Sequence, residues 1–368
     1  MKKRVVTVFL TGLLAASMLL GGCTSKSEKK ALEYKELGIK QLQQEDYDGA
    51  VDSFQKALDQ SLGRITAIEL DVCYYKALAQ YKSGDAKAAL ESYSALIDYD
   101  EKNWEVYYLR GSVYLSEGDK DKCLKDYEKA VELNASDLGL YGHICENLKN
   151  AGEDDEAEKY LEQGLALQPS SGTDYENVGY LYTIKGDTEN AVKAYQQAVE
   201  KGTDSASLKL GELYFEEGNT DEAKKAFEAY MEKHPDDADA LTHLADIAAE
   251  SGDTEDAAAY YEKAIDVADK SDQQGLRKNL VAFYENAGDF ASALKETKSY
   301  VADYPKDTAM QKEYEFLQTR VENSTGDAIE GTVDDGTSAD TSSSDSSAAS
   351  DAQKLPILLV EKSDLYQW

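Results

Sequence analysis

The sequence predicts an all-α protein, an α-α superhelix of about eight helical hairpins followed by one capping helix. Two observations predict this class. Short turn-like pairs recur at a nearly constant spacing along most of the 368 residues. Small and aromatic residues also recur at fixed distances on both sides of these turns. A period near 34 residues with a turn inside each unit is typical of stacked helical hairpins.

The first 22 residues differ from the rest and predict a signal peptide. Lys2, Lys3 and Arg4 precede an apolar run over residues 5–20, and a Gly-Gly pair follows immediately before Cys23. A basic start, a short apolar run and small residues before a cleavage site are typical of export signals. A permanent membrane helix is the alternative, but such a helix needs about 20 apolar residues.

Residues 19–25, LLGGCTS, resemble the lipobox of bacterial lipoproteins. The resemblance implies that residues 1–22 are removed and that Cys23 carries acyl chains such as palmitate. Two or more acyl chains anchor a protein stably to a bilayer. We therefore expect attachment to the cell membrane at its extracytoplasmic face, with residues 23–30 as a short linker. The sequence leaves open whether the bacterial envelope is Gram-positive or Gram-negative.

The repeated turns define eight units over residues 31–305. They lie at Glu45-Asp46, Gly84-Asp85, Gly118-Asp119, Gly152-Glu153, Gly186-Asp187, Gly218-Asn219, Gly252-Asp253 and Gly288-Asp289. The successive differences are 39, 34, 34, 34, 32, 34 and 36 residues. The second unit follows an insertion, so its register is the least well defined. The eighth departs from the pattern, with Arg277 and Thr297 at usually aromatic positions.

The fifth unit, YENVGYLYTIKGDTENAVKAYQQAVE, shows the pattern of small and bulky residues most clearly. Its fixed positions hold Tyr175, Val178, Gly179, Tyr182, Ala191, Tyr195 and Ala198. This pattern resembles the tetratricopeptide repeat, W-x2-L-G-x2-Y…A-x3-F…P. We expect the small residues Gly179 and Ala191 to set the closest approach of the two helices. Gly186 is expected to end the first helix in the left-handed conformation.

Three further cysteines fall on packing positions of this repeat. Cys123 and Cys145 replace small residues, and Cys73 replaces the first aromatic residue. An odd number of cysteines cannot all pair within one chain. We expect free, buried cysteines that pack like small apolar residues. A redox or metal role is the alternative, although no CxxC spacing supports it.

A capping helix is predicted over residues 306–322, and a disordered acidic tail over residues 323–368. The tail is rich in Ser and Asp, and such segments bury too little apolar surface to fold. Its apolar end, LPILLV at residues 355–360, is either without a role or a short motif that docks in a groove. If it binds its own chain, the last repeats are the expected target.

Charge and residue types exclude several functions. There are 39 Lys and Arg against 72 Asp and Glu, a formal net charge of −33, which repels nucleic acid phosphates. The three histidines lie in no triad or metal-binding arrangement. We therefore predict no enzyme, no catalytic residues, no cofactor, no metal site and no nucleic acid partner.

The tetratricopeptide resemblance implies a peptide-binding groove lined by the first helices of the hairpins. The implied positions hold Tyr74, Leu78, Tyr81, Tyr108, Leu115, Tyr180, Leu208, Phe215, Glu212 and Asp246. Their aromatic and then acidic character suits a ligand with apolar anchors and a basic flank. Some of the tyrosines could instead belong to the core, because an error of one residue rotates a helix by about 100°.

These features together predict an exported, lipid-anchored scaffold that binds proteins or peptides at the outer face of a bacterial membrane. The alternative is a structural subunit of an envelope assembly or secretion complex, of the outer-membrane or pilus biogenesis type. The sequence identifies neither the ligand nor the oligomeric state.

Overall fold

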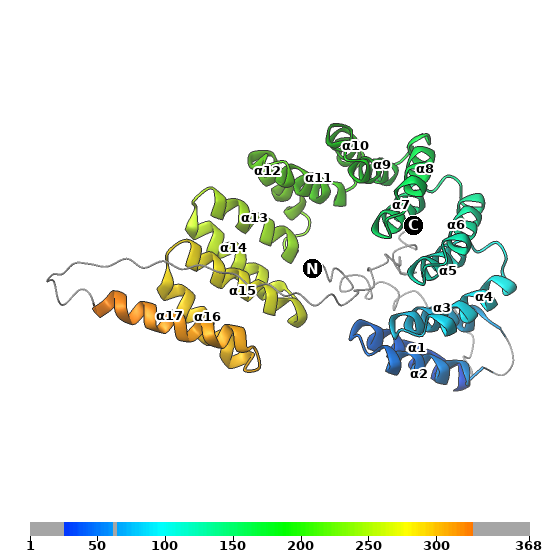
Figure 1. The fold of residues 1–368 in the computed structure, drawn as a ribbon, viewed down its shortest axis with the longest axis horizontal. Helices are drawn as coiled ribbons and strands as arrows, with labels where there is room; N and C mark the ends of the chain where they lie inside the picture. Colours follow the sequence, from blue (N-terminus) through cyan, green and yellow to red (C-terminus); the bar gives the residue numbers. More distant parts are fainter. Residues whose placement is uncertain (1–25, 62–64, 327–368) are drawn as a thin grey trace, which may run out of the picture. The chain divides into compact units, whose positions relative to one another are not determined.

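The structure is a computed structural model that describes residues 26–61 and 65–326 (Figure 1). All of the elements in these two ranges are helices. The predicted signal peptide, Cys23 and the tail from residue 327 onward lie outside the described residues. The predicted all-α class is confirmed for the described part of the chain.

Seventeen helices follow one another in the described ranges. They are α1 (Lys26–Gln43), α2 (Tyr47–Leu58), α3 (Ala67–Lys82), α4 (Ala86–Tyr99), α5 (Trp104–Ser116), α6 (Lys120–Leu133), α7 (Leu138–Asn150), α8 (Asp154–Leu165), α9 (Gly172–Lys185), α10 (Thr188–Glu200), α11 (Ser205–Glu216), α12 (Thr220–Met231), α13 (Ala238–Glu250), α14 (Thr254–Val267), α15 (Lys270–Asn286), α16 (Phe290–Asp303) and α17 (Thr308–Gly326).

The helices follow the order of the eight predicted hairpins, and seven of the pairs pack together within a unit: α1 with α2, α3 with α4, α5 with α6, α7 with α8, α11 with α12, α13 with α14 and α15 with α16. The helix α17 stands where the capping helix was expected, and it packs against α16. The first helix begins earlier than predicted, at Lys26, within the segment expected to be a linker. Lys, Glu and Ala dominate residues 26–33, and all three are good helix formers, which accounts for the earlier start.

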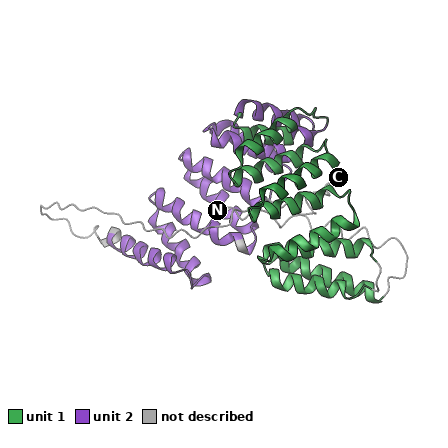
Figure 2. Cartoon of the chain, turned by 45° about the vertical axis from the view of Figure 1, so that its right-hand side comes forward, with its two compact units in different colours: residues 1–170, 177–187, 352–368 green, residues 171–176, 188–351 purple. Residues whose placement is uncertain are grey.

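The chain divides into two compact units (Figure 2). The described part of unit 1 is residues 26–170 and 177–187, and that of unit 2 is residues 171–176 and 188–326. Within each unit, helices that are consecutive in the chain pack against one another. This order is that of stacked hairpins, in which each hairpin buries its faces against its neighbours.

The turn inside each hairpin explains the regular spacing. Gly186 has a φ of 77°, and the glycines of the other Gly-containing turns have similar positive values, which confirms the expected left-handed helix ends. In the first hairpin Glu45 takes this place with a φ of 59°. The following aspartate caps the next helix: the Asp85 side chain accepts a hydrogen bond of 3.0 Å from the backbone N–H of Ala88. This bond satisfies one of the free N–H groups at a helix start.

In three hairpins other than the one that holds Gly179 and Ala191, the glycine of the first helix lies against an aromatic ring. A Cβ atom on Gly38 would lie 2.6 Å from a ring carbon of Phe54. In two further hairpins, the same construction places the Cβ 2.7 to 2.8 Å from a ring: Gly111 on Tyr127 and Gly211 on Phe227. In these hairpins the glycine of the first helix therefore accommodates an aromatic ring of the second helix, because no side chain separates them.

The cysteines behave largely as predicted. Cys123 and Cys145 are fully buried and free, and burial raises the pKa of each thiol to about 12. Both sit in the main core cluster of unit 1. Cys73 is also free but only partly buried, so it differs from the other two in its access to solvent.

Candidate functional site

Four of the predicted groove residues belong to the core of unit 1. Tyr74, Leu78 and Tyr108 are each no more than 2% exposed, and Leu115 is 7% exposed. All four pack in the same core cluster on α3 and α5. Their side chains offer a ligand almost no surface, so the core alternative left open by the sequence applies to them.

The other predicted residues are partly exposed on first helices. In unit 1 they are Tyr81 on α3 and Tyr180 on α9, and in unit 2 they are Leu208, Glu212 and Phe215 on α11 and Asp246 on α13. Each of these six side chains is therefore partly accessible within its own unit.

Tyr108 is fixed by a buried polar network. The side-chain nitrogen of Asn147 lies 3.0 Å from the Tyr108 hydroxyl and 3.2 Å from both the Ser112 and Tyr127 hydroxyls. The rings of Tyr108 and Tyr127 stack with their centroids 5.7 Å apart. Burial raises the pKa of both tyrosines, so they remain neutral. The network pairs buried polar groups with one another and stabilises the core.

Beside this network, α7 and α9 form a partly exposed surface in unit 1. The Tyr180 hydroxyl donates a hydrogen bond to the Glu146 carboxylate. The Tyr180 ring lies directly over Gly142, where a Cβ atom would come within 2.7 Å of it. The ring of His143 lies 6.1 Å from the Tyr180 ring, and the Lys149 ammonium donates to the Ile184 carbonyl at 2.7 Å. We call Gly142, His143, Glu146, Lys149 and Tyr180 the α7–α9 surface.

His143 is an uncharged member of this surface. Burial lowers its pKa to about 4, and within the described part of the chain its Nδ1 atom has no hydrogen-bond partner. Sequence reasoning missed both His143 and Glu146. A signal for Glu146 was available, because it precedes Tyr180 by 34 residues, the repeat length, and thus holds the same position in the preceding first helix.

The acidic residues predicted in unit 2 already have partners. Glu212 pairs with Lys209 at 3.1 Å, and the Asp246 carboxylate accepts a hydrogen bond from the Tyr261 hydroxyl. The Phe215 ring lies 5.7 Å from the His243 ring. This face combines an aromatic ring with two carboxylates, of which Glu212 is paired with an ammonium group and Asp246 accepts a hydrogen bond.

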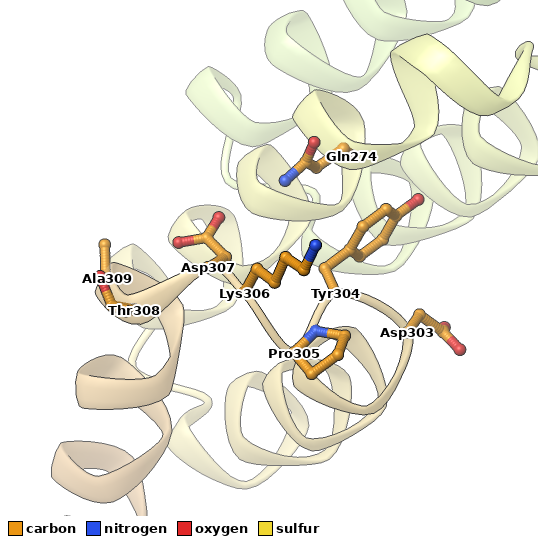
Figure 3. Close-up of a pocket in the computed structure, with 8 residues that line it drawn as sticks. All are labelled: Gln274, Asp303, Tyr304, Pro305, Lys306, Asp307, Thr308 and Ala309. Atoms are coloured by element: carbon orange, nitrogen blue, oxygen red, sulfur yellow. The ribbon is translucent and has the colours of Figure 1, made fainter.

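A pocket of about 580 Å³ lies at the turn between α16 and α17 (Figure 3). Gln274 contributes from α15, and the other lining residues are Asp303 to Ala309. The Gln274 amide donates to the Tyr300 hydroxyl at 2.8 Å, and that hydroxyl donates to Asp307 at 2.8 Å. These polar groups connect helices to one another, so we assign the pocket a structural role.

Residues 26–61 and 65–326 contain neither a metal-binding cluster nor a membrane-spanning helix. No three His, Cys, Asp or Glu side chains of these residues lie close enough together to hold a metal ion. None of the helices described for the chain has both the length and the apolar character needed to cross a membrane.

Comparison with known families identifies the repeat. The tetratricopeptide repeat family matches this chain over residues 104–137, 175–200 and 208–273. These segments correspond to the hairpin α5 and α6, to most of α9 and α10, and to the region from α11 into α15.

Curated relatives share only part of their length with this chain. The small glutamine-rich tetratricopeptide repeat-containing protein 2 of Mycosarcoma maydis is 27% identical over 114 residues, which is 31% of this chain and 32% of that protein. The Hsp70-Hsp90 organizing protein 2 of Arabidopsis thaliana is 25% identical over 131 residues, 36% of this chain and 19% of that protein. This chain thus spans a third or less of the length of both relatives.

Among solved structures, yeast Tom70 has a TM-score of 0.58 at 20% identity, covering 71% of this chain and 55% of that chain. At this identity the likeness concerns the fold. The matched repeats, the helical hairpins and this fold agree with one another. This chain contains tetratricopeptide repeats over the matched residues.

Proposed function

We propose that this protein is an exported, lipid-anchored scaffold that binds a protein or peptide segment on the α7–α9 surface. The observation that carries the binding proposal is the state of Tyr180. Its ring is partly exposed, yet Gly142 beneath it and Glu146 at its hydroxyl hold it in one orientation. An aromatic anchor that is already ordered loses little side-chain entropy when it binds, and tyrosine is among the residues that contribute most at interfaces.

The chemistry around Tyr180 defines the kind of ligand. Glu146 adds a carboxylate, and His143 is neutral because its pKa is lowered to about 4. The whole chain carries a formal charge of −33, which attracts a basic segment from a distance. We therefore propose a ligand with an apolar side chain for Tyr180 and a Lys or Arg for Glu146.

The anchor is proposed from the N-terminal sequence alone. A basic start, a short apolar run and LLGGCTS before the first repeat support export and acylation at Cys23. The first helix begins at Lys26, three residues after Cys23, so an acylated protein would keep unit 1 close to the bilayer.

The anchor is tested by feeding cells a palmitate analogue that carries an alkyne tag. The expected result is a labelled protein in the membrane fraction, and a Cys23→Ser variant that takes up no label. Absence of label from the unmodified protein would refute the anchor and leave the binding proposal standing.

Ligand binding is tested with a photo-crosslinking residue at position 180, compared with the same residue at Glu158. Glu158 is an exposed position on the second helix α8 and serves as the control. We expect a discrete adduct at position 180, and Glu146→Gln should reduce its yield. Mass spectrometry of the adduct can then locate basic residues in the captured ligand. Equal capture at position 158 would refute the α7–α9 surface as the binding site. Tyr108 is unsuitable for the probe, because it is 1% exposed.

A further inference from the structure

An apolar groove of about 380 Å³ lies in unit 1, lined by α2, α3 and α4. Its apolar lining includes Leu58, Ile65, Leu70, Cys73, Leu96 and Tyr99, and we call it the α2–α4 groove. It lies where an insertion separates the first two repeats, and none of these residues belongs to the α7–α9 surface. Its volume is at the lower end of the range for small ligand sites, so it fits a short segment better than a folded partner.

The groove exposes apolar surface that a folded chain normally covers. Ile65 is 60% exposed and Tyr99 is 53% exposed, and both border the groove. Burial of apolar surface stabilises by about 25 cal/mol per Å², and exposed apolar patches commonly mark sites of interaction. A short apolar segment would therefore gain free energy by binding here.

We propose that the chain's own C-terminal segment, residues 355–360, docks in the α2–α4 groove. This segment, LPILLV, is the longest apolar stretch that follows the last described helix. Pro356 favours an extended backbone for itself and for Leu355, which suits a narrow groove between helices. The 28 residues from 327 to 354 form a connector that spans up to about 95 Å when fully extended.

The segment and the groove each carry one basic and one acidic residue. Lys354 precedes the apolar residues and Glu361 follows them. The groove presents Glu69 and Lys76 from α3, seven positions apart and therefore separated by about 10 Å along the helix. An extended segment separates Lys354 and Glu361 by about 23 Å, so one opposite-charge pair forms at a time, either Lys354 with Glu69 or Glu361 with Lys76.

The last repeats, which the sequence suggested as the target, suit this segment less well. Their pocket is lined by Gln274, Lys306 and two aspartates, Asp303 and Asp307 (Figure 3). Covering such polar groups with aliphatic side chains would remove their contact with water without replacing it, which costs free energy.

The reactivity of the cysteine thiols can be used to measure docking of the segment. Cys73 lines the groove and is partly buried, whereas Cys123 and Cys145 are fully buried in the core of the same unit. A docked segment would shield the Cys73 thiol from a maleimide reagent. The two buried cysteines report any unfolding, because they would react only if the core opened.

The experiment uses the full chain with Cys23→Ser, so that three thiols remain. We expect the double substitution Ile357→Asp and Leu358→Asp to raise the rate of Cys73 labelling about tenfold, because the tethered segment is held at a high effective concentration. Ser346→Asp, in the connector, should leave the rate unchanged. A synthetic peptide of residues 353–368 should restore protection to the double variant.

Substitutions in the groove provide the matching half of the test. Ala95 is an exposed residue of α4 that lines the groove, and Ala95→Glu should raise Cys73 labelling as the tail variant does. Ala88→Glu, on the same helix outside the lining, should not. An identical Cys73 rate with and without the tail substitutions would overturn the proposal. Protection that disappears on dilution would overturn docking within one chain, because it would assign the segment to a second copy.

Discussion

A neutral network in unit 1 and a charged cluster at the end of unit 2 both join neighbouring helices. In unit 1 the amide of Asn147 joins the hydroxyls of Tyr108 and Tyr127. In unit 2 the guanidinium of Arg277, a residue that is 9% exposed, contacts Glu296 at 2.5 Å and Asp303 at 2.6 Å. The repeat therefore accepts either chemistry, provided that buried polar atoms have partners.

The Asn147 network and the Arg277 cluster differ in their response to salt. The Asn147 network carries no formal charge, so screening by ions does not weaken it. The Arg277 cluster includes the Asp303 side chain, which is 61% exposed, and ions screen such partly solvated pairs. Salt therefore distinguishes the two regions experimentally.

The largest expected effect is that of Asn147→Ala. Removing the amide leaves three buried hydroxyls with fewer partners and creates a cavity, and we expect a loss of about 3 kcal/mol in the free energy of unfolding. Arg277→Ala should cost about 2 kcal/mol, because one of its carboxylate partners is already solvated. Both losses can be measured by urea unfolding.

High salt and a control variant on α7 separate the two losses of stability. In 0.5 M NaCl, a concentration at which the Debye length is only a few ångströms, the cost of Arg277→Ala should shrink and that of Asn147→Ala should persist. Asn150→Ala, at the exposed end of the same helix α7, should change stability by no more than about 0.5 kcal/mol. Equal salt sensitivity of the two large losses would contradict the distinction between the regions.

A smaller effect separates two helix glycines, one in each unit. A Cβ on Gly111 would lie 2.8 Å from the Tyr127 ring, whereas a Cβ on Gly275 would have no neighbour within 4 Å. Gly111→Ala should therefore destabilise by about 1 to 2 kcal/mol through overpacking. Gly275→Ala should stabilise by about 0.5 to 1 kcal/mol, because alanine is the better helix former. Thermal melts of the two variants should shift in opposite directions, and a stabilised Gly111→Ala would refute the close-contact argument.

The fold could be predicted from the sequence because the turns carry a strong local signal. Gly186 and its equivalents take a positive φ, a conformation that excludes most other residues, so their spacing reveals the hairpins directly. The contact partner of the first-helix glycine was harder to predict. Small residues occur on both helices of each hairpin, and only the packed structure shows that Gly111 meets the Tyr127 ring.

The candidate site could be predicted only in part, because its residues acquire their roles from other hairpins. Tyr108 and Tyr180 are both tyrosines on first helices, yet Tyr108 is buried and Tyr180 is partly exposed. The difference depends on Asn147, 39 residues after Tyr108, and on Gly142, which lies under Tyr180. Local periodicity predicts which face of a helix a residue occupies, but it does not predict contacts with residues that are distant in the sequence.

The smallest predicted effect concerns pH at the end of unit 2. Burial and the neighbouring Glu313 carboxyl raise the pKa of Glu285 from 4.5 to about 7, against an opposing effect of Arg320. The pair joins α15 to α17, so its protonation affects how firmly the capping helix is held. In unit 1 the neutral Asn147 network has no group that titrates in this range.

The direction of the pH effect follows from proton binding. Between pH 4.5 and about 7 the folded state holds more protons at Glu285 than the unfolded state does. The contribution of protonated Glu285 to the free energy of unfolding is therefore fully present below pH 4.5 and is lost as pH rises through this range. Because Glu285 is partly exposed, we expect the loss to be no more than about 1 kcal/mol. Hydrogen exchange of the α17 amides should be faster at pH 8 than at pH 5, after correction for the intrinsic rate. Glu285→Gln should remove this difference, because the amide cannot ionise. A pH dependence that survives Glu285→Gln would assign the effect to another group.

Asp307 provides an independent check at the same end of unit 2. Lys278 lowers the pKa of Asp307, so the contribution of Asp307 to the free energy of unfolding is lost only in stronger acid.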